Sequence, residues 1–324
     1  MADAAVHAEG ILKRYGDVVA VNHLDLTVQP GDVYGVLGPN GAGKTTFLRI
    51  LFGLIRADEG SFSIFGRTFH EHGMACLDGV AGFIESPKFY PYMSGRQNLE
   101  LLASLDGGDA AGRIAASLER VHLDQAADRN VGGYSFGMRQ RLGVAASLIR
   151  DPQLLVLDEP ANGLDPAGIR DMRALVKELA QQGLTVLLSS HNMLEVEEIC
   201  DHVTIMNTGN VVYHGSIADL KAQAPKPGYS ISTSDDARAV AICGAVTGVA
   251  DVQRQAHPAT GLLVRADAGV IDEMTVALGT NGIGIRSLIE LEAPLESLFF
   301  QLTEGTNSPH AAGLSPQPTH GDSQ

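Results

Sequence analysis

The segment Gly38-Pro-Asn-Gly-Ala-Gly-Lys44-Thr45 fits the pattern G-x-x-x-x-G-K-[ST]. It lies between a buried-strand pattern at residues 33–37 and a helical pattern at residues 46–54. Glycines at such a turn let backbone N–H groups point inward around a triphosphate, and the N-terminus of the next helix adds a positive dipole end. A glycine-rich turn without a ligand is the alternative, which the flanking strand and helix disfavour. The predicted ATP-binding residues are Gly38, Pro39, Asn40, Gly41, Ala42, Gly43, Lys44, Thr45 and Thr46.

A second motif places two adjacent carboxylates at the end of an apolar strand pattern, residues 153–157. Asp158 is predicted to hold Mg²⁺ together with the Thr45 hydroxyl, while Lys44 pairs with the β- and γ-phosphates. Glu159 is then placed to polarise the attacking water. A strand capped by a solvated acidic turn is the alternative, and the spacing from Lys44 disfavours it. Together the two motifs predict an ATP hydrolase that uses Mg²⁺.

The stretch Tyr134-Ser-Phe-Gly-Met-Arg-Gln-Arg141 narrows the class of hydrolase. It resembles the signature motif of ATP-binding cassette (ABC) proteins, usually written L-S-G-G-Q, although Phe136 and Met138 depart from that pattern. Ser135 is suited to cap the following helix, and the N–H of Gly137 is suited to face a phosphate. In this form the motif resembles that of ATPases that export antibiotics, including those that confer bacitracin or lantibiotic resistance.

Three further positions match the ABC family by resemblance, and a fourth, Glu85, departs from its usual residue. Asp165 matches the D-loop, and His191 matches the switch histidine, which would act in catalysis with Glu159. Tyr15 matches the aromatic residue that stacks on adenine, and a half-buried surface tyrosine is the alternative. Glu85 stands where the family usually has a glutamine that contacts Mg²⁺ and the membrane partner. An ordinary loop acid is the alternative for Glu85.

The resemblance implies a catalytic site that one chain cannot complete. In the family, two cassettes dimerise head to tail around two ATP molecules, so the loop containing Lys44 faces the Ser135 signature of the other copy. A separate transmembrane permease completes the transporter and holds the ATPase at the cytoplasmic face of the cell membrane. The leading prediction is therefore a homodimeric ATPase subunit of a transporter that exports a drug, antibiotic or peptide.

A soluble ABC ATPase of DNA repair, chromosome maintenance or translation is the alternative. Repair and chromosome-maintenance members carry long insertions before the signature, whereas Lys44 and Ser135 are only 91 residues apart here. Translation members fuse two cassettes in one chain, and this chain has one. A regulatory module without hydrolysis is a third class, which an intact Glu159 and His191 disfavour.

The order of strand and helix patterns predicts an α/β fold with two domains and a tail. Residues 1–222 are expected to form a P-loop ABC ATPase domain, a mixed sheet core with a helical subdomain at about residues 87–149. Two prolines and a glycine within residues 224–228 indicate a linker. Residues 225–304 are expected to form a small α+β accessory domain, and residues 305–324 a disordered tail.

Composition excludes several other classes of protein. Of the 324 residues, 44% are hydrophobic and 19% are charged, which allows a sizeable core. The net charge of −15 argues against a nucleic-acid partner, since nonspecific binding to phosphates needs a cationic surface. The longest apolar stretches stop at about a dozen residues, short of the roughly 20 that a membrane-spanning helix needs. Three widely spaced cysteines suit a reducing, cytoplasmic compartment.

Overall fold

The computed structural model describes residues 3–106, 108–224, 226–254, 261–291 and 294–304. The chain divides into two compact units, residues 1–218 and 219–324. This division falls shortly before the stretch 224–228 that the sequence indicates as a linker. The predicted disordered tail, residues 305–324, lies outside the described residues. Within the described ranges, no helix has both the length and the apolar character needed to cross a membrane.

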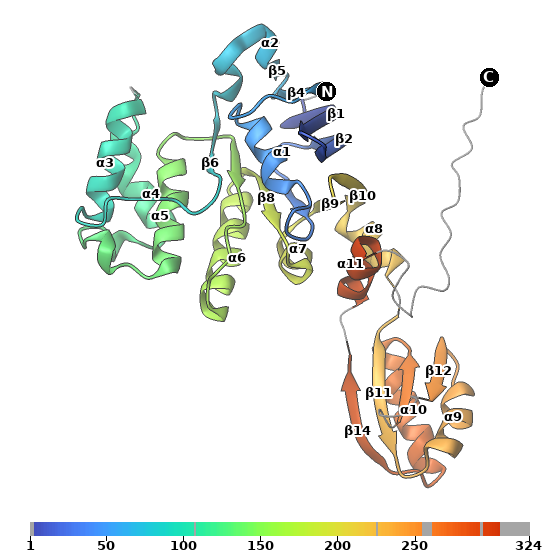
Figure 1. The fold of residues 1–324 in the computed structure, drawn as a ribbon. Coiled ribbons are helices and arrows are strands. Elements are labelled where there is room, and N and C mark those ends of the chain that lie inside the picture. Colours follow the sequence, from blue (N-terminus) through green and yellow to red (C-terminus); the bar gives the residue numbers. More distant parts are fainter. Residues whose placement is uncertain (1–2, 107, 225, 255–260, 292–293, 305–324) are drawn as a thin grey trace, which may run out of the picture. The chain divides into compact units, whose positions relative to one another are not determined.

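A six-stranded sheet forms the centre of the first unit (Figure 1). Its order is β10-β9-β3-β8-β7-β6, and all neighbours run parallel except β9 and β10. Three of these strands are buried along their whole length, as in a sheet covered on both faces. The strands are β3 (Val33–Leu37), β6 (Val80–Phe83), β7 (Leu154–Leu157), β8 (Thr185–Ser190), β9 (His202–Asn207) and β10 (Asn210–Ser216).

The connection from β3 to the first helix, α1 (Lys44–Leu51), carries the glycine-rich segment. The predicted strand at residues 33–37 is confirmed. The helix expected at residues 46–54 begins earlier, at Lys44, and ends at Leu51. Its early end has a local cause, because Gly53 adopts a left-handed φ of 65° that stops the helical geometry.

A second sheet of the first unit is antiparallel and has the order β2-β1-β4-β5. The sequence did not predict it, because register shifts such as the one between Ala8 and Ile11 interrupt the alternation of buried and exposed residues. This sheet shares one hydrophobic core with α1 and the central sheet. Its strands are β1 (Val6–Tyr15), β2 (Val18–Val28), β4 (Glu59–Ile64) and β5 (Arg67–Thr68).

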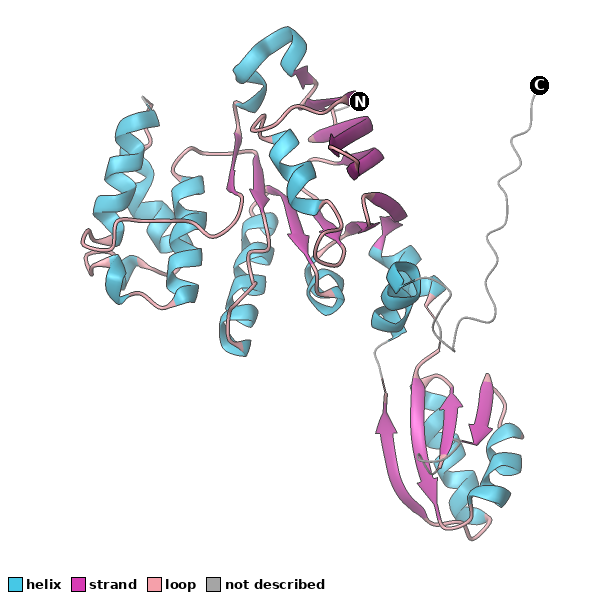
Figure 2. Cartoon of the chain, viewed as in Figure 1, coloured by secondary structure: helices cyan, strands magenta, loops and turns pink. Residues whose placement is uncertain are grey.

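Helices fill the stretch between β6 and β7, where the sequence predicts a helical subdomain (Figure 2). They are α3 (Gly95–Asp106), α4 (Ile114–Arg120) and α5 (Phe136–Leu148), with short 3₁₀ turns at Ala111–Arg113, Asp124–Ala126 and Val131–Gly133. The other helices of this unit are α2 (Phe69–His72), followed by the 3₁₀ turn Gly73–Leu77, and α6 (Pro166–Gln181) and α7 (Met193–Ile199). The helix α8 (Ile217–Gln223) spans the division between the units.

The second unit is built on a four-stranded antiparallel sheet of order β12-β13-β11-β14. Apolar residues of α9 and α10 form a core with β11 and β13. β14 is exposed along its whole length, so its sequence shows no alternation of buried and exposed residues. The elements are β11 (Gly228–Thr233), α9 (Asp236–Gly244), β12 (Asp251–Arg254), β13 (Leu262–Arg265), α10 (Ala268–Thr280), β14 (Ile285–Glu290) and α11 (Pro294–Glu304).

Candidate nucleotide-binding and hydrolysis site

The loop between β3 and α1 requires glycine at two positions. Gly43 precedes α1 with a φ of 105°, and a Cβ added there would lie 2.1 Å from the carbonyl oxygen of Ala20. A Cβ on Gly38 would lie 2.3 Å from the carbonyl oxygen of Met206. No side chain caps the N-terminus of α1, so its first N–H groups have no acceptor within the helix. This backbone is suited to bind phosphate.

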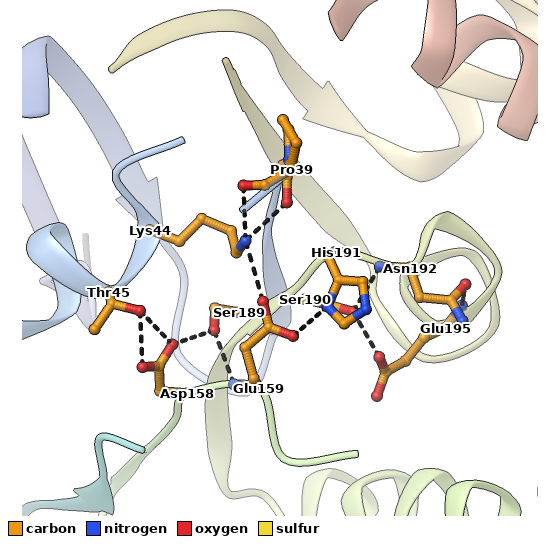
Figure 3. Close-up of polar contacts among 11 residues, drawn as sticks. Pro39, Lys44, Thr45, Asp158, Glu159, Ser189, Ser190, His191, Asn192 and Glu195 are labelled. Atoms are coloured by element: carbon orange, nitrogen blue, oxygen red, sulfur yellow. Dashed lines mark hydrogen bonds and ion pairs between the residues drawn. The ribbon is translucent and has the colours of Figure 1, made fainter. Parts of the chain in front are cut away.

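Lys44 is buried beside the loop, with 5% of its side chain exposed. Its Nζ donates to the carbonyl oxygens of Gly38 at 2.7 Å and Pro39 at 3.2 Å, and it lies 3.1 Å from Oε1 of Glu159 (Figure 3). A buried ammonium group needs an anion nearby, and here a carboxylate of the same chain supplies it. A phosphate entering the loop can replace Glu159 as that anion.

Asp158 joins the first turn of α1 to the end of β8. Its carboxylate accepts from Thr45 Oγ1 at 2.9 and 3.2 Å and from Ser189 Oγ at 2.5 Å (Figure 3). Asp158 is 4% exposed. Thr45 and Asp158, which the sequence predicts to hold the same Mg²⁺, lie in contact. The sequence motifs do not predict a role for Ser189, although its position two residues before His191 at the end of a strand could have indicated one.

Glu159 is held between a cation and a histidine. One carboxylate oxygen pairs with Lys44, and the other lies 2.5 Å from Nδ1 of His191, which donates in the tautomer that this contact requires. The Glu159 N–H donates to Ser189 Oγ at 2.9 Å. Its φ of 49° is left-handed, a strained conformation for a residue other than glycine. Such strain at a carboxylate beside a phosphate-binding loop is typical of a functional site.

A cleft of about 320 Å³ opens over the loop. Two exposed valines at the start of β2, Val18 and Val19, give the cleft an apolar side that the sequence motifs do not indicate. The sequence feature that could have indicated this apolar side is the pair of β-branched residues directly after the turn at residues 16–17. The lining residues are Val18, Val19, Ala20, Asn40, Gly41, Ala42, Gly43, Lys44, Thr45, Thr46, Glu159, Asn162 and Thr208.

Tyr15 ends β1 directly opposite Val18 in the β1–β2 register. Its ring is 49% exposed and carries the ammonium group of Lys13 at 5.7 Å from the ring centroid. Tyr15 does not line the cleft itself, but its cross-strand partner does. The tyrosine therefore stands at the rim of the cleft, next to its apolar side.

The signature residues lie at the start of α5 and do not line this cleft. Ser135 caps α5 as predicted, since its Oγ accepts from the N–H of Met138 at 3.2 Å. The ring of Phe136 lies under the guanidinium group of Arg139, 5.9 Å from ring centroid to Cζ. Gly137 is partly exposed. Within the described residues, the signature and the glycine-rich loop thus belong to separate parts of the surface.

Asp165 and Glu85 make contacts that the sequence did not indicate. The Asp165 carboxylate caps α6 by accepting from the N–H of Gly168 at 2.8 Å. Glu85 follows β6 with a φ of 66°, and its Oε1 lies 2.5 Å from Nη2 of Arg49 in the last turn of α1. Among the described residues, no hydrogen bond or ion pair joins Glu85 to Asp158.

The residues present fit a nucleotide with Mg²⁺. The hydroxyl of Thr45 and the carboxylate of Asp158 are oxygen donors in contact, which is the donor set that Mg²⁺ takes beside phosphates. A buried Lys44 and a loop that leaves no room for a side chain at Gly38 or Gly43 suit phosphate oxygens. The exposed valines offer an apolar wall to a base.

Comparisons with known proteins identify the family of the chain. A family model described as "ABC transporter" matches residues 21–162. The uncharacterized ABC transporter ATP-binding protein YdbJ of Bacillus subtilis (strain 168) is 42% identical over 212 residues, 65% of this chain and 69% of that protein. The bacitracin transport ATP-binding protein BcrA of Bacillus licheniformis is 36% identical over 296 residues, 91% of this chain and 96% of that protein.

The fold is likewise that of a solved cassette. The structure of cbiO1 from Clostridium perfringens, part of the ABC transporter complex cbiONQ, superposes with a TM-score of 0.63. The two chains are 24% identical, and the superposition covers 68% of this chain and 92% of the cbiO1 chain. This similarity confirms the predicted P-loop ABC ATPase fold. By its relatives and its fold, the chain belongs to the ABC transporter family, as an ATP-binding and ATP-hydrolysing subunit.

Proposed function

We propose that this protein drives the export of a drug, antibiotic or peptide through a separate membrane permease. The similarity to the bacitracin transport protein supports this proposal, because it extends over 91% of the chain and so includes the second unit. A similarity of this extent to a transport protein also disfavours the soluble alternatives in DNA repair, chromosome maintenance or translation. The permease would hold the protein at the cytoplasmic face of the cell membrane.

The observation that carries the proposed chemistry is the position of Glu159 between Lys44 and His191. In this arrangement the carboxylate is occupied by the lysine, so it is not free to take a proton from water. When phosphate oxygens occupy the glycine-rich loop, Lys44 pairs with them and one carboxylate oxygen of Glu159 is released. Glu159 then accepts a proton from the attacking water, while His191 keeps the carboxylate oriented.

The two oxygen donors beside Lys44 have a different task. Thr45 and Asp158 would hold Mg²⁺, which supplies positive charge to the transferred phosphoryl group. Ser189 orients Asp158 by donating to it at 2.5 Å, and the same oxygen accepts the Glu159 N–H. One serine therefore sets the positions of both carboxylates. Glu85, tied to Arg49, would join the metal only after releasing that guanidinium group.

A second copy would supply the residues that the cleft lacks. Ser135 and Gly137 do not line the cleft of their own chain, which supports a head-to-tail homodimer in which they reach the partner's nucleotide. In that arrangement Ser135, together with the N–H groups of the α5 N-terminus, would face the γ-phosphate of the other copy. Asp165, at the start of α6, would lie between the two sites.

A matched pair of variants tests these roles. Glu159→Gln keeps the volume of the side chain but removes the base, so turnover should fall by about 10²- to 10⁴-fold while ATP still binds and holds a stable dimer. Lys44→Ala should instead weaken ATP binding by about 10- to 100-fold, because a charge-assisted hydrogen bond is worth about 1.5–3 kcal/mol. ATP hydrolysis, ATP affinity and sedimentation with ATP are to be measured for both.

Glu159→Gln should affect ATP turnover and Lys44→Ala should affect ATP binding. If Glu159→Gln hydrolyses ATP at the wild-type rate, Glu159 is not the general base. If Lys44→Ala binds ATP as tightly as the wild type, the glycine-rich loop is not the phosphate site.

A further inference from the structure

Two adjacent serines at the end of β8 face opposite ways. Successive side chains of a strand point to opposite faces of the sheet. Ser189 donates to Asp158 in the nucleotide site, whereas Ser190 donates to Oε2 of Glu195 in α7 at 2.6 Å (Figure 3). Both serines are fully buried. The strand end that carries His191 is thus attached to the site on one face and to Glu195 on the other.

Glu195 is a buried carboxylate outside the nucleotide cleft. It is 5% exposed and lies in the first turn of α7, close enough to Arg173 of α6 for their charges to interact. Burial raises the pKa of Glu195, and the hydrogen bond from Ser190 partly opposes that shift. Keeping an acid in such a place is costly, and an apolar side chain often serves a core position at least as well. Packing alone therefore does not explain why a glutamate occupies position 195.

Ser190, the partner of Glu195, makes hydrogen bonds next to His191. Ser190 Oγ donates to Glu195 and accepts from the N–H of Asn192 at 3.0 Å, so it holds the residues on both sides of the histidine. The Ser190 carbonyl also accepts from the N–H of Gly38 at 3.2 Å, which ties the same residue to the glycine-rich loop. Asn192 in turn caps α7 through its own side chain.

The imidazole of His191 has little packing of its own. Its side chain is 45% exposed, compared with 18% for its partner Glu159. The contact between Nδ1 and the carboxylate therefore depends on the backbone at residues 190–192. A small displacement of a catalytic group costs rate much more than it costs binding.

We propose that Glu195 is a positioning residue for ATP hydrolysis: by holding Ser190, it fixes the backbone on both sides of His191 and keeps the imidazole against Glu159. This inference rests on the proposed roles of Glu159 and His191. It assigns no contact between Glu195 and the nucleotide. Glu195 acts on the rate of hydrolysis and leaves ATP binding to the glycine-rich loop.

Three variants of the full chain test the inference. Glu195→Gln keeps an oxygen that accepts from Ser190, so it should retain at least half of the wild-type kcat. Glu195→Leu removes the acceptor and should lower kcat by about 10- to 100-fold with the KM for ATP within about twofold. The double variant Ser190→Ala/Glu195→Leu removes both partners, so no buried hydroxyl is left unpaired. It should show the same loss of kcat with a melting temperature close to that of the wild type.

Glu198→Gln is the matched control, because Glu198 lies on the same helix and pairs with Arg173 and Lys177 at 49% exposure. Its kcat should equal that of the wild type. A wild-type kcat in Glu195→Leu and in the double variant overturns the inference. An equal loss of kcat in Glu195→Gln and Glu195→Leu, with a parallel fall in melting temperature, would show a structural role and also overturn it.

A second readout separates this inference from the proposed function. The ring ¹⁵N signals of His191, assigned by comparison with His191→Gln, report its contact with Glu159 in the absence of nucleotide. They should move in Glu195→Leu and stay in place in Glu195→Gln. If the wild-type chain does not hydrolyse ATP, the proposed function fails, and these signals still decide whether Glu195 positions the histidine.

Discussion

The two units of the chain bury very different side chains. The first unit encloses charged and hydroxyl groups, among them Lys44, Asp158, Ser189 and Glu195. In the described part of the second unit, Thr233 is the polar residue that is buried, and the remaining core is aliphatic, aromatic or sulfur-containing. Buried polar groups are costly unless each has a partner. The first unit therefore carries most of the costly buried polar groups among the described residues, including Lys44 and Asp158 of the candidate site.

The two central sheets differ in a way that explains this contrast. In the first unit the parallel strands β3 and β8 are buried along their whole length, and loops at their carboxyl ends meet at one edge. That edge brings the glycine-rich loop and His191 together, as expected for a parallel sheet in an α/β fold. In the second unit β11 alternates between buried and partly exposed residues. Its antiparallel sheet packs on one face and leaves the other to solvent.

If the two units unfold independently, a cavity in the core of the second unit should leave ATP hydrolysis by the first unit intact. Met274 in α10 is fully buried in the core of the second unit. Met274→Ala should destabilise that unit by about 2–5 kcal/mol, because it removes buried methylene groups and leaves a cavity. ATP hydrolysis should stay within about twofold of the wild type. Calorimetry should show one of two unfolding transitions shifted to lower temperature.

Val276→Ala is the control for this variant, since Val276 lies on the same helix and is 65% exposed. It should change stability by less than about 0.5 kcal/mol. A single transition that shifts as a whole in Met274→Ala would show that the units unfold together. A large loss of ATP hydrolysis would show that the second unit supports the site.

The part of the fold that the sequence predicted rests on local patterns. The glycine-rich loop is recognisable because a side chain at Gly38 or Gly43 would collide with backbone, so the residue type is fixed. The strand at residues 33–37 is a continuous apolar run, and its Tyr34 is 1% exposed. Thr45 and Asp158 were placed together because family motifs carry their spacing, and the structure brings them within 2.9 Å.

What the sequence did not predict depends on contacts between distant residues. The pairing of Arg49 with Glu85 joins an α1 side chain to a loop after β6, and no local pattern indicates it. Glu195 is one of three glutamates in α7, and a run of acids on a short helix predicts a solvated face. Its burial follows from how α7 packs, with contacts to β3 and β8. Sequence alone therefore missed the groups that we propose to position Glu159 and His191.

Each unit buries a tyrosine, Tyr34 in the first and Tyr229 in the second, whose ionisation can be followed with pH. The Tyr34 hydroxyl contacts Thr204 Oγ1 at 2.8 Å and His214 Nδ1 at 2.9 Å, and burial raises its pKa to about 12. Above pH 10 an unfolded chain ionises this phenol while the folded chain keeps it neutral, so stability falls as pH rises. By pH 11 the loss should reach about 1.4 kcal/mol, the equivalent of one pKa unit.

Tyr34→Phe should therefore show a flatter decline of stability between pH 9 and 11 than the wild type, as measured by urea unfolding. Tyr229→Phe is the counterpart in the second unit, where burial also raises the pKa of the phenol. No hydrogen bond to the Tyr229 hydroxyl is found among the described residues. Its removal should cost less stability at neutral pH than removal of the Tyr34 hydroxyl. If the stability of Tyr34→Phe falls between pH 9 and 11 as steeply as that of the wild type, the raised pKa of Tyr34 does not cause the decline.

The smallest expected effect concerns a polar residue of the first unit that is exposed. Glu85 is 66% exposed and pairs with Arg49, itself 39% exposed. Exposed ion pairs contribute at most about 1 kcal/mol. Glu85→Gln changes the charge at nearly constant volume, so basal ATP hydrolysis should stay within about tenfold, a barrier change of 1.4 kcal/mol or less. Burial, rather than polarity alone, would then mark the indispensable acids of this unit.

Glu85→Ala tests whether this acid is more than a partner of Arg49. If Glu85 releases the guanidinium group and contacts Mg²⁺ and the permease, loss of its oxygen should raise the Mg²⁺ requirement and harm transport more than hydrolysis. Arg49→Ala is the matched control, because it breaks the same ion pair and keeps the carboxylate. The measurements are the ATPase rate against Mg²⁺ concentration and the drug resistance of cells that carry each variant with its permease. Wild-type behaviour of Glu85→Ala in both assays would make Glu85 an ordinary loop acid, whereas a defect shared equally with Arg49→Ala would assign the effect to the ion pair and not to the metal.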